Sequence, residues 1–254
     1  MQRQGSTFPI DGLMIRTEDI DKPPPLHIDS LKHNQNEQQM RIEITPISES
    51  ALVCRLNAPS ELGKQQKLWE FAAALEQHDR IEEVVVGMNN LTVFTRFDTD
   101  LATLADELQY VWEHTAVTDH QGKLVEISVC YGGEYGPDLA EVAAFHQTDI
   151  SEIVRRHTAQ TYTVFMMGFQ PGFPYLGGLP EALHTPRRAV PRTSVPAGSV
   201  GIGGSQTGVY PFASPGGWQI IGRTELPLFR ADLNPPTLLA AGDQVRFVAE
   251  RIEP

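Results

Sequence analysis

The sequence predicts two successive folded parts of different class, an α+β sandwich followed by a mainly-β domain. Over residues 41–114, apolar residues change from strand-like alternation to helical spacing and back. In contrast, residues 168–223 hold 12 of the 21 glycines and 8 of the 19 prolines. Both residue types are disfavoured inside helices. Because large apolar residues are interleaved with them, this glycine-rich segment predicts short strands and tight loops in a packed β domain.

Composition limits the functional classes that apply. The 254 residues are 41% hydrophobic and carry a net charge of −12, so nucleic acid is not expected as a partner. No apolar run approaches the roughly 20 residues that cross a bilayer, and the N-terminus lacks a signal-peptide pattern. We therefore expect a cytoplasmic protein with no membrane partner. Cys54 and Cys130 show no metal-ligand spacing, so no metal site is expected.

The first 114 residues divide into an extension and a sandwich. Residues 1–40 contain few apolar groups, which predicts a disordered N-terminal extension. Strands are expected at 41–47, 52–56, 81–86 and 91–95, and amphipathic helices at 61–77 and 101–112. Pro59-Ser60 and Asp98-Thr99-Asp100 are the expected capping signals of the two helices. The order ββαββα predicts a ferredoxin-like sandwich over residues 41–114.

A polar linker at 115–123 precedes the predicted β domain, residues 124–254. A strand at 125–131 enters a glycine-rich turn, and two short helices follow. Asp149 and Glu152 form a capping-box pattern at the start of the second helix. A strongly apolar strand at 161–167 feeds the glycine-rich segment, and a last strand at 245–248 is expected to close a β-barrel.

The charge of the glycine-rich segment is uneven. No acid lies between Glu181 and Glu225, whereas four arginines do. Arginine offers a planar fork of donors that suits carboxylate or phosphate. One interpretation is a pocket for an anionic ligand, built from Arg187, Arg188, Arg192 and Arg223. The alternative is that these arginines pair with acids elsewhere in an acidic chain.

Other candidate residues are isolated. Glu134 lies in a glycine-rich turn and is an acid/base candidate or simply a turn residue. His157 ends a short helix and is a candidate base, or a cation favoured by the helix dipole. Ser199 lies in a sequence that approximates a nucleophile elbow, but a turn serine is the favoured interpretation. Neither a P-loop nor a dinucleotide-binding glycine pattern is present.

Several strings together resemble a known family. They are YGGEYGPDL at 131–139, GF with PGFPYLGGL within 168–179, PRR at 186–188, VPAGSV at 195–200 and SPGGW at 214–218. They are similar to the family that includes the B subunit of bacterial ATP-dependent 5-oxoprolinase. The same family includes the inhibitor of the sporulation histidine kinase and half of the carboxyltransferase domain of urea carboxylase. The resemblance covers residues 41–250, with Gln147 standing where the family often has glycine and Arg230 where aspartate is usual.

The resemblance implies a cyclophilin-like barrel and a hetero-oligomeric hydrolase. The partners would be the homologous C subunit and the A subunit of 5-oxoprolinase. ATP, with or without Mg²⁺, would be shared with the partner subunit. Glu134 and His157 are the acid/base candidates. The expected clamp on substrate or phosphate consists of the four arginines, with Ser199, Gln206 and Tyr210 as hydrogen-bonding residues.

Two other functions stay open at this point. A regulatory protein that binds and inhibits a sensor histidine kinase is the main alternative, because the chain contains no complete catalytic constellation. Urea or allophanate chemistry is ranked third, because neither a biotin-attachment nor an amidase signature is present.

Overall fold

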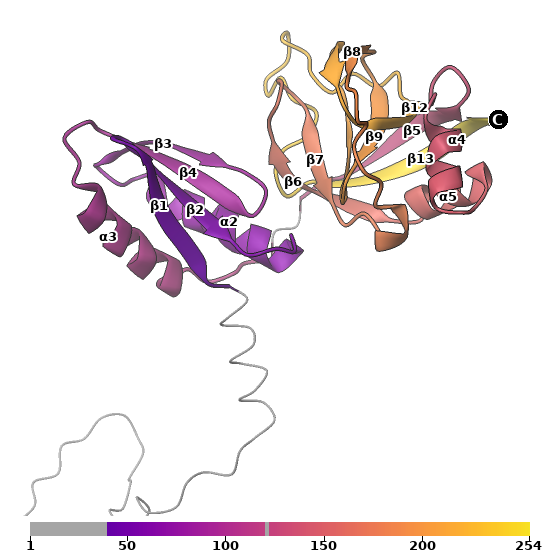
Figure 1. Cartoon of the computed structure of the whole chain (residues 1–254). Helices are drawn as coiled ribbons and strands as arrows, with labels where there is room; N and C mark the ends of the chain where they lie inside the picture. The colour runs from indigo at the N-terminus through magenta and orange to yellow at the C-terminus, as the bar shows by residue number, and fades with distance from the viewer. Residues whose placement is uncertain (1–39, 120–121) are drawn as a thin grey trace, which may run out of the picture. The chain divides into compact units, whose positions relative to one another are not determined.

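A computed structural model of the chain describes residues 40–119 and 122–254. The expectation of disorder over residues 1–40 therefore falls, except for Met40, outside the described residues. Figure 1 labels the elements along the chain. Those of the first part are β1 (Ile42–Ser48), β2 (Ala51–Leu56), α2 (Leu62–Leu75), β3 (Ile81–Val86), β4 (Asn90–Thr95) and α3 (Leu101–His114).

The first part is a four-stranded antiparallel sheet with the order β1-β2-β4-β3. Alternate residues of the strands, such as Cys54 and Val93, are fully buried on one face. They share a core with the apolar sides of α2 and α3, which lie on the same side of the sheet (Figure 1). Within that core, Phe71 and Trp112 pack edge to face with ring centroids 5.4 Å apart. The predicted order ββαββα is confirmed.

The two helix caps differ from each other. Asp100 accepts a hydrogen bond from the Ala102 amide and caps α3, as the sequence predicts. The signal at Pro59-Ser60 is wrong for α2, because Glu61 occupies the N-cap and its side chain makes no capping bond. Lys64 instead secures the entry to this helix. Its buried ammonium donates to the backbone carbonyls of Asn57 and Pro59.

The second part is built on a closed barrel with the strand order β10-β7-β6-β13-β5-β12-β9. β13 pairs with β5 in parallel and with β6 antiparallel, so the last strand closes the barrel as predicted. A separate ribbon joins β8 to β11. The strands are β5 (Leu124–Gly132), β6 (Thr161–Met167), β7 (Pro174–Gly177), β8 (Arg192–Val195), β9 (Ser199–Gly203), β10 (Gln206–Val209), β11 (Ser214–Gly216), β12 (Gln219–Arg223) and β13 (Gln244–Glu253).

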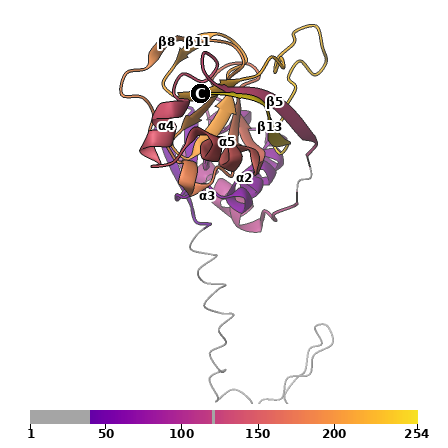
Figure 2. The same cartoon turned by 90° about the vertical axis from the view of Figure 1, so that its right-hand side faces the viewer.

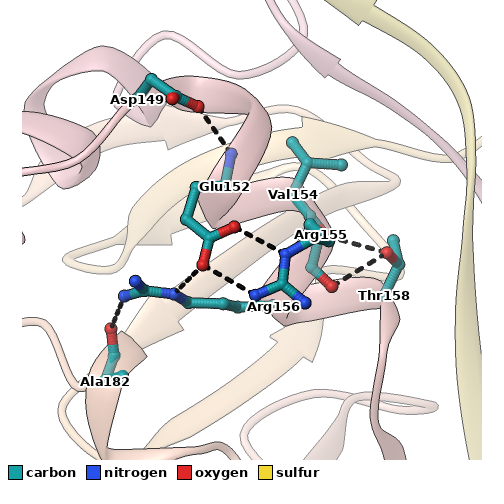
Figure 3. A network of polar contacts seen from close by, with 7 residues as sticks. All are labelled: Asp149, Glu152, Val154, Arg155, Arg156, Thr158 and Ala182. Carbon is teal, nitrogen blue, oxygen red and sulfur yellow. Dashed lines mark hydrogen bonds and ion pairs between the residues drawn. The ribbon is translucent and has the colours of Figure 1, made fainter.

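Two short helices, α4 (Leu139–Phe145) and α5 (Ile150–Thr158), lie side by side against the barrel (Figure 2). Asp149 accepts from the Glu152 amide and caps α5, which confirms the predicted capping signal. Figure 3 shows that the Glu152 carboxylate accepts from both Arg155 and Arg156. These hydrogen bonds lower the pKa of Glu152 to about 2. Arg156 also donates to the Ala182 carbonyl of the 3₁₀ helix η1 (Glu181–Leu183) and thereby fixes α5 against that turn.

Gln147 occupies a backbone position that suits glycine. Its φ is 52°, in the left-handed region. Its amide donates to the Ala144 carbonyl and the Thr148 amide donates to the Ala143 carbonyl. This is a Schellman motif that ends α4, and its left-handed residue is usually glycine. The conformation suits the glycine that the family resemblance leads us to expect at this position, where this chain has glutamine.

Apolar residues from the strands, α4 and α5 form one barrel core, and an aromatic cluster lies beside it. Across residues 40–119 and 122–254, none of the helices is both long and apolar enough to cross a membrane.

Candidate functional site

The glycine-rich segment is organised around Asp138, a residue that precedes α4. Its carboxylate is 1% exposed. It accepts hydrogen bonds from Arg188 Nη1 at 2.7 Å and from Arg192 Nη1 and Nη2 at 2.8 and 2.7 Å. The Ile220 amide donates to the same carboxylate at 2.6 Å, and the Asp138 amide donates back to the Ile220 carbonyl. A buried carboxylate with four donors therefore ties α4, β8, β12 and the loop before β8 together.

Two of the four predicted ligand-binding arginines are thus occupied by this acid. The hydrogen bonds that Arg192 donates to Asp138 raise the pKa of Arg192 above its ordinary value. A buried carboxylate needs such charge-assisted donors, because burial of an unpaired charge is strongly unfavourable. For Arg188 and Arg192 the alternative expectation is confirmed: they pair with an acid elsewhere in the chain.

Arg187, unlike Arg188, does not pair with an acid of the described residues. It is exposed, and within the part of the chain that the structure describes no acid lies within ion-pair distance of it. Its guanidinium carbon lies 5.8 Å from the centroid of the Trp218 ring, a distance at which a cation is attracted by the ring face. This leaves the guanidinium fork of Arg187 available for an anion.

Arg187 lines an open pocket of about 500 Å³, which we name the Arg187 pocket. One wall is cationic, Thr185 and Gln219 add hydrogen-bonding groups, and α4 contributes apolar surface. The volume is within the range of small-molecule sites. Its lining residues are Glu141, Val142, Phe145, Thr185, Pro186, Arg187, Arg188, Ala189, Val190 and Gln219.

The Trp218 ring that Arg187 contacts belongs to an aromatic cluster. Trp218 packs edge to face on Phe173 and Tyr175, with centroids 5.5 and 5.9 Å apart. Tyr210 packs on two rings of the cluster, Phe173 and Trp218. Burial raises the pKa of both Tyr175 and Tyr210, and Arg187 is among the neighbours that oppose this shift. The phenols therefore stay neutral near the cation.

His157, a predicted acid/base residue, lies in the barrel core and is 0% exposed. Its ring nitrogens contact the hydroxyls of Tyr131 at 2.8 Å and Thr207 at 3.0 Å. Phe247 stacks on the ring with centroids 4.5 Å apart. Burial lowers the pKa of His157 to about 3. The imidazole is therefore closed off from solvent in the folded chain, and both of its ring nitrogens contact buried hydroxyls.

The remaining candidates do not join the Arg187 pocket. Ser199 is 1% exposed at the start of β9, and β9 leads into β10 rather than into the helix of a nucleophile elbow. Gln206 begins β10 opposite Gly203. Glu134 is exposed in the turn after β5. Arg223 lines a second pocket that shares no residue with the first.

Comparison with known proteins decides the family. Residues 42–239 match the family described as "Carboxyltransferase domain, subdomain C and D". The chain belongs to this family. It is 58% identical over 212 residues to the B subunit of 5-oxoprolinase from Haemophilus influenzae, a match that covers 84% of this chain and 100% of the relative. The protein of the same name from Escherichia coli O157:H7 is 50% identical over 206 residues, 81% of this chain and 94% of the relative.

A solved structure supports the fold of this family member. The urea amidolyase of K. lactis superposes with a TM-score of 0.71 over 84% of this chain and 15% of that chain. At 17% identity the likeness concerns the fold alone.

Sequence reasoning missed the residue on which the site depends. Asp138 lies more than 40 residues before the arginines, within the glycine-rich string that identifies the family. The signal that could have indicated such a residue is the absence of any acid between residues 181 and 225. Any acid that pairs with these arginines must therefore come from a distant part of the sequence. Trp218, the ring that Arg187 contacts, looks in sequence like any other apolar residue of the segment.

Proposed function

We propose that this chain is the B subunit of a multi-component, ATP-dependent 5-oxoprolinase. Together with the homologous C subunit and the A subunit, it would convert 5-oxoproline, ATP and water into glutamate, ADP and phosphate. The observation that carries the proposal is the 58% identity to a protein that bears this name, over that protein's whole length. The ferredoxin-like and cyclophilin-like descriptions of the two parts, and the domain boundaries near 114 and 124, stay predictions.

The Arg187 pocket offers groups that match 5-oxoproline. This substrate is a small five-membered lactam with one carboxylate. Arg187 supplies an unpaired guanidinium for that carboxylate, and charge-assisted pairs of this kind are among the stronger hydrogen bonds. Phe145 and Val190, which are 55% and 76% exposed, supply apolar surface for the ring methylenes. We place the carboxylate at Arg187 and the ring against α4.

Asp138 has a positioning role in this proposal. It holds Arg188, the residue that follows Arg187, and it fixes Ile220, the residue that follows Gln219. Two walls of the Arg187 pocket are therefore attached to one buried carboxylate. Rigid support of this kind sets the precision of a binding site.

The described residues fit ATP only in part. Arg187 and Arg188 line the Arg187 pocket, but Arg188 already donates to Asp138. No group of three His, Cys, Asp or Glu side chains within residues 40–119 and 122–254 is arranged to hold a metal ion. We therefore assign no chemical step to ATP or Mg²⁺ in this chain, and propose that the nucleotide is shared with the partner subunit.

Substitution of Arg187 tests the pocket. Glutamate release from 5-oxoproline would be measured with the assembled three-subunit mixture, in which this chain carries Arg187→Ala, Arg187→Lys or the control Arg230→Ala. Arg230 is an exposed arginine paired with Asp232. Loss of one charged hydrogen bond of about 1.5–3 kcal/mol lowers kcat/KM for Arg187→Ala roughly 10- to 100-fold.

The variants separate the pocket from the function. Arg187→Lys is expected to recover part of the activity, because lysine keeps the charge but loses the planar fork. Wild-type activity in a folded Arg187→Ala complex would overturn the pocket assignment. No turnover in any assembled mixture would overturn the enzyme proposal. Inhibition of histidine-kinase autophosphorylation by the same preparation would then support the regulatory alternative.

A further inference from the structure

The second pocket contains charged groups that the Arg187 pocket does not use. We name it the Tyr135 pocket. It has a volume of about 300 Å³ and is formed where β5, β12 and β13 meet the turn after β5. Such a volume lies at the small end of the range for metabolite sites. Its lining residues are Cys130, Tyr135, Arg223, Glu225, Glu250 and Arg251.

The turn that carries Tyr135 is fixed by backbone packing. The amides of Tyr135 and Gly136 both donate to the Gly132 carbonyl. Gly132 has a φ of 76°, and a Cβ atom there would overlap the carbonyl oxygen of Glu253. A Cβ at Gly136 would likewise overlap the carbonyl oxygen of Ile221. The turn therefore lies directly on β12 and β13, so the backbone that carries Tyr135 is held in place by the fold.

Two arginines approach that ring. The guanidinium carbons of Arg223 and Arg251 lie 4.6 and 5.5 Å from its centroid. Arg251 is paired with Glu253 at 2.9 Å. Arg223, in contrast, has no acid within ion-pair distance among the residues that the structure describes. The ring thus orients one guanidinium that has a charge partner and one that has none.

Two acids line the same pocket. Glu225 and Glu250 are exposed, and neither makes an ion pair within the described ranges 40–119 and 122–254. A polyanion such as a triphosphate would meet these two carboxylates, and a simple cation would meet the arginines. A ligand that carries a carboxylate next to an ammonium group satisfies both sets of side chains.

We propose that the Tyr135 pocket binds a free α-amino acid. Its carboxylate would pair with Arg223, and its ammonium group with Glu225 and Glu250. The choice of L-glutamate as the first ligand rests on the proposed function, since glutamate is the product of that reaction. The substrate 5-oxoproline lacks the ammonium group, because its nitrogen is a neutral lactam amide. The pocket therefore distinguishes product from substrate.

Cys130 provides a direct readout because it lines the Tyr135 pocket. The experiment measures alkylation of Cys130 by iodoacetamide in the purified full chain, by mass spectrometry, with increasing L-glutamate or 5-oxoproline. Cys54 is the internal control: it is 0% exposed and burial raises its pKa to about 12, so the native chain leaves it unmodified. We expect saturating L-glutamate to slow Cys130 alkylation at least threefold, and 5-oxoproline to protect much less.

Variants assign the protection to this pocket. Arg223→Ala, and Glu225→Gln combined with Glu250→Gln, are expected to abolish it. The double variant changes only exposed side chains, so its fold is not in question. Arg187→Ala is expected to keep the protection, because Arg187 lies outside the Tyr135 pocket.

Three outcomes would overturn the proposal. They are no protection by L-glutamate at any concentration, equal protection by 5-oxoproline, and loss of protection in Arg187→Ala instead of Arg223→Ala. Because alkylation is measured on the isolated chain, it does not depend on turnover by the complex. Failure of glutamate release and failure of this binding are therefore separate results.

Discussion

Replacement of Asp138 by asparagine tests whether one buried carboxylate holds the arginine region together. The substitution keeps the shape of the side chain but removes the charge that Arg188 and Arg192 contact. Removal of one partner from a buried ion pair costs about 3–5 kcal/mol. The side chains of Arg188 and Arg192 are 28% and 26% exposed, so water partly solvates their charges once the carboxylate is removed. We therefore expect a loss of stability at the lower end of that range, about 3 kcal/mol. For a chain of this size that corresponds to a fall in Tm of roughly 6–12 °C.

The assay for Asp138→Asn is thermal unfolding followed by near-ultraviolet circular dichroism, which reports on the aromatic cluster around Trp218. Asp232→Asn is the matched control. It removes the carboxylate of the exposed Arg230–Asp232 pair, and such surface pairs contribute little to stability. Equal Tm values for Asp138→Asn and Asp232→Asn would refute the reasoning that the buried pair organises this region.

Three further predictions concern stability. His157 stays neutral in the fold, with a pKa of about 3, whereas the unfolded chain binds a proton near pH 6.5. The free energy of unfolding should therefore fall by about 1.4 kcal/mol per pH unit below pH 6.5, which is about 2 kcal/mol by pH 5. Chemical denaturation at a series of pH values should show that, in His157→Gln, the slope of the unfolding free energy against pH is smaller by one proton. An unchanged slope would contradict this. Gly132→Ala should lower the free energy of unfolding by about 2 kcal/mol or more, because φ is 76° and the new Cβ would meet the Glu253 carbonyl. Gly63→Ala in α2, where a Cβ meets nothing within 4 Å, should raise it by roughly 0.5–1 kcal/mol. Equal effects of the two substitutions would contradict the steric argument. Gln147→Gly should raise stability by up to about 1 kcal/mol by relieving the left-handed conformation, and a loss would show that the Gln147 side chain matters more than its backbone.

The spacing of apolar residues was sufficient to predict the strands and helices of the first part, because it reports directly which side of each element is buried. The four strands and two helices of residues 42–114 follow alternation and helical spacing, and each observed element lies within two residues of its expected bounds. The predicted N-cap of α2 was wrong, because Glu61 occupies that position without a capping hydrogen bond and Lys64, in the first turn of α2, donates instead to carbonyls of the preceding loop. The closed barrel was expected only in outline, since short strands in a glycine-rich segment carry little periodic signal.

The site was predicted less well because it depends on contacts between distant residues. The four arginines and missing acids of the glycine-rich segment are visible in the sequence, but composition does not tell which guanidinium pairs with an acid. Asp138 lies on the chain before α4 and reaches Arg192 across 54 residues, so no local pattern connects them. The burial of His157 could not be predicted, because a helix-ending histidine looks the same in sequence whether it faces solvent or a barrel core.

The most direct test of the central claim is glutamate release from 5-oxoproline and ATP by the purified A and C subunits, with and without this chain. The proposed function predicts no release from those two alone, release when this chain is added, and saturation at a fixed ratio of the three components. Equal release without the chain, or none from a well-folded complete mixture, would contradict the assignment of this chain as the B subunit.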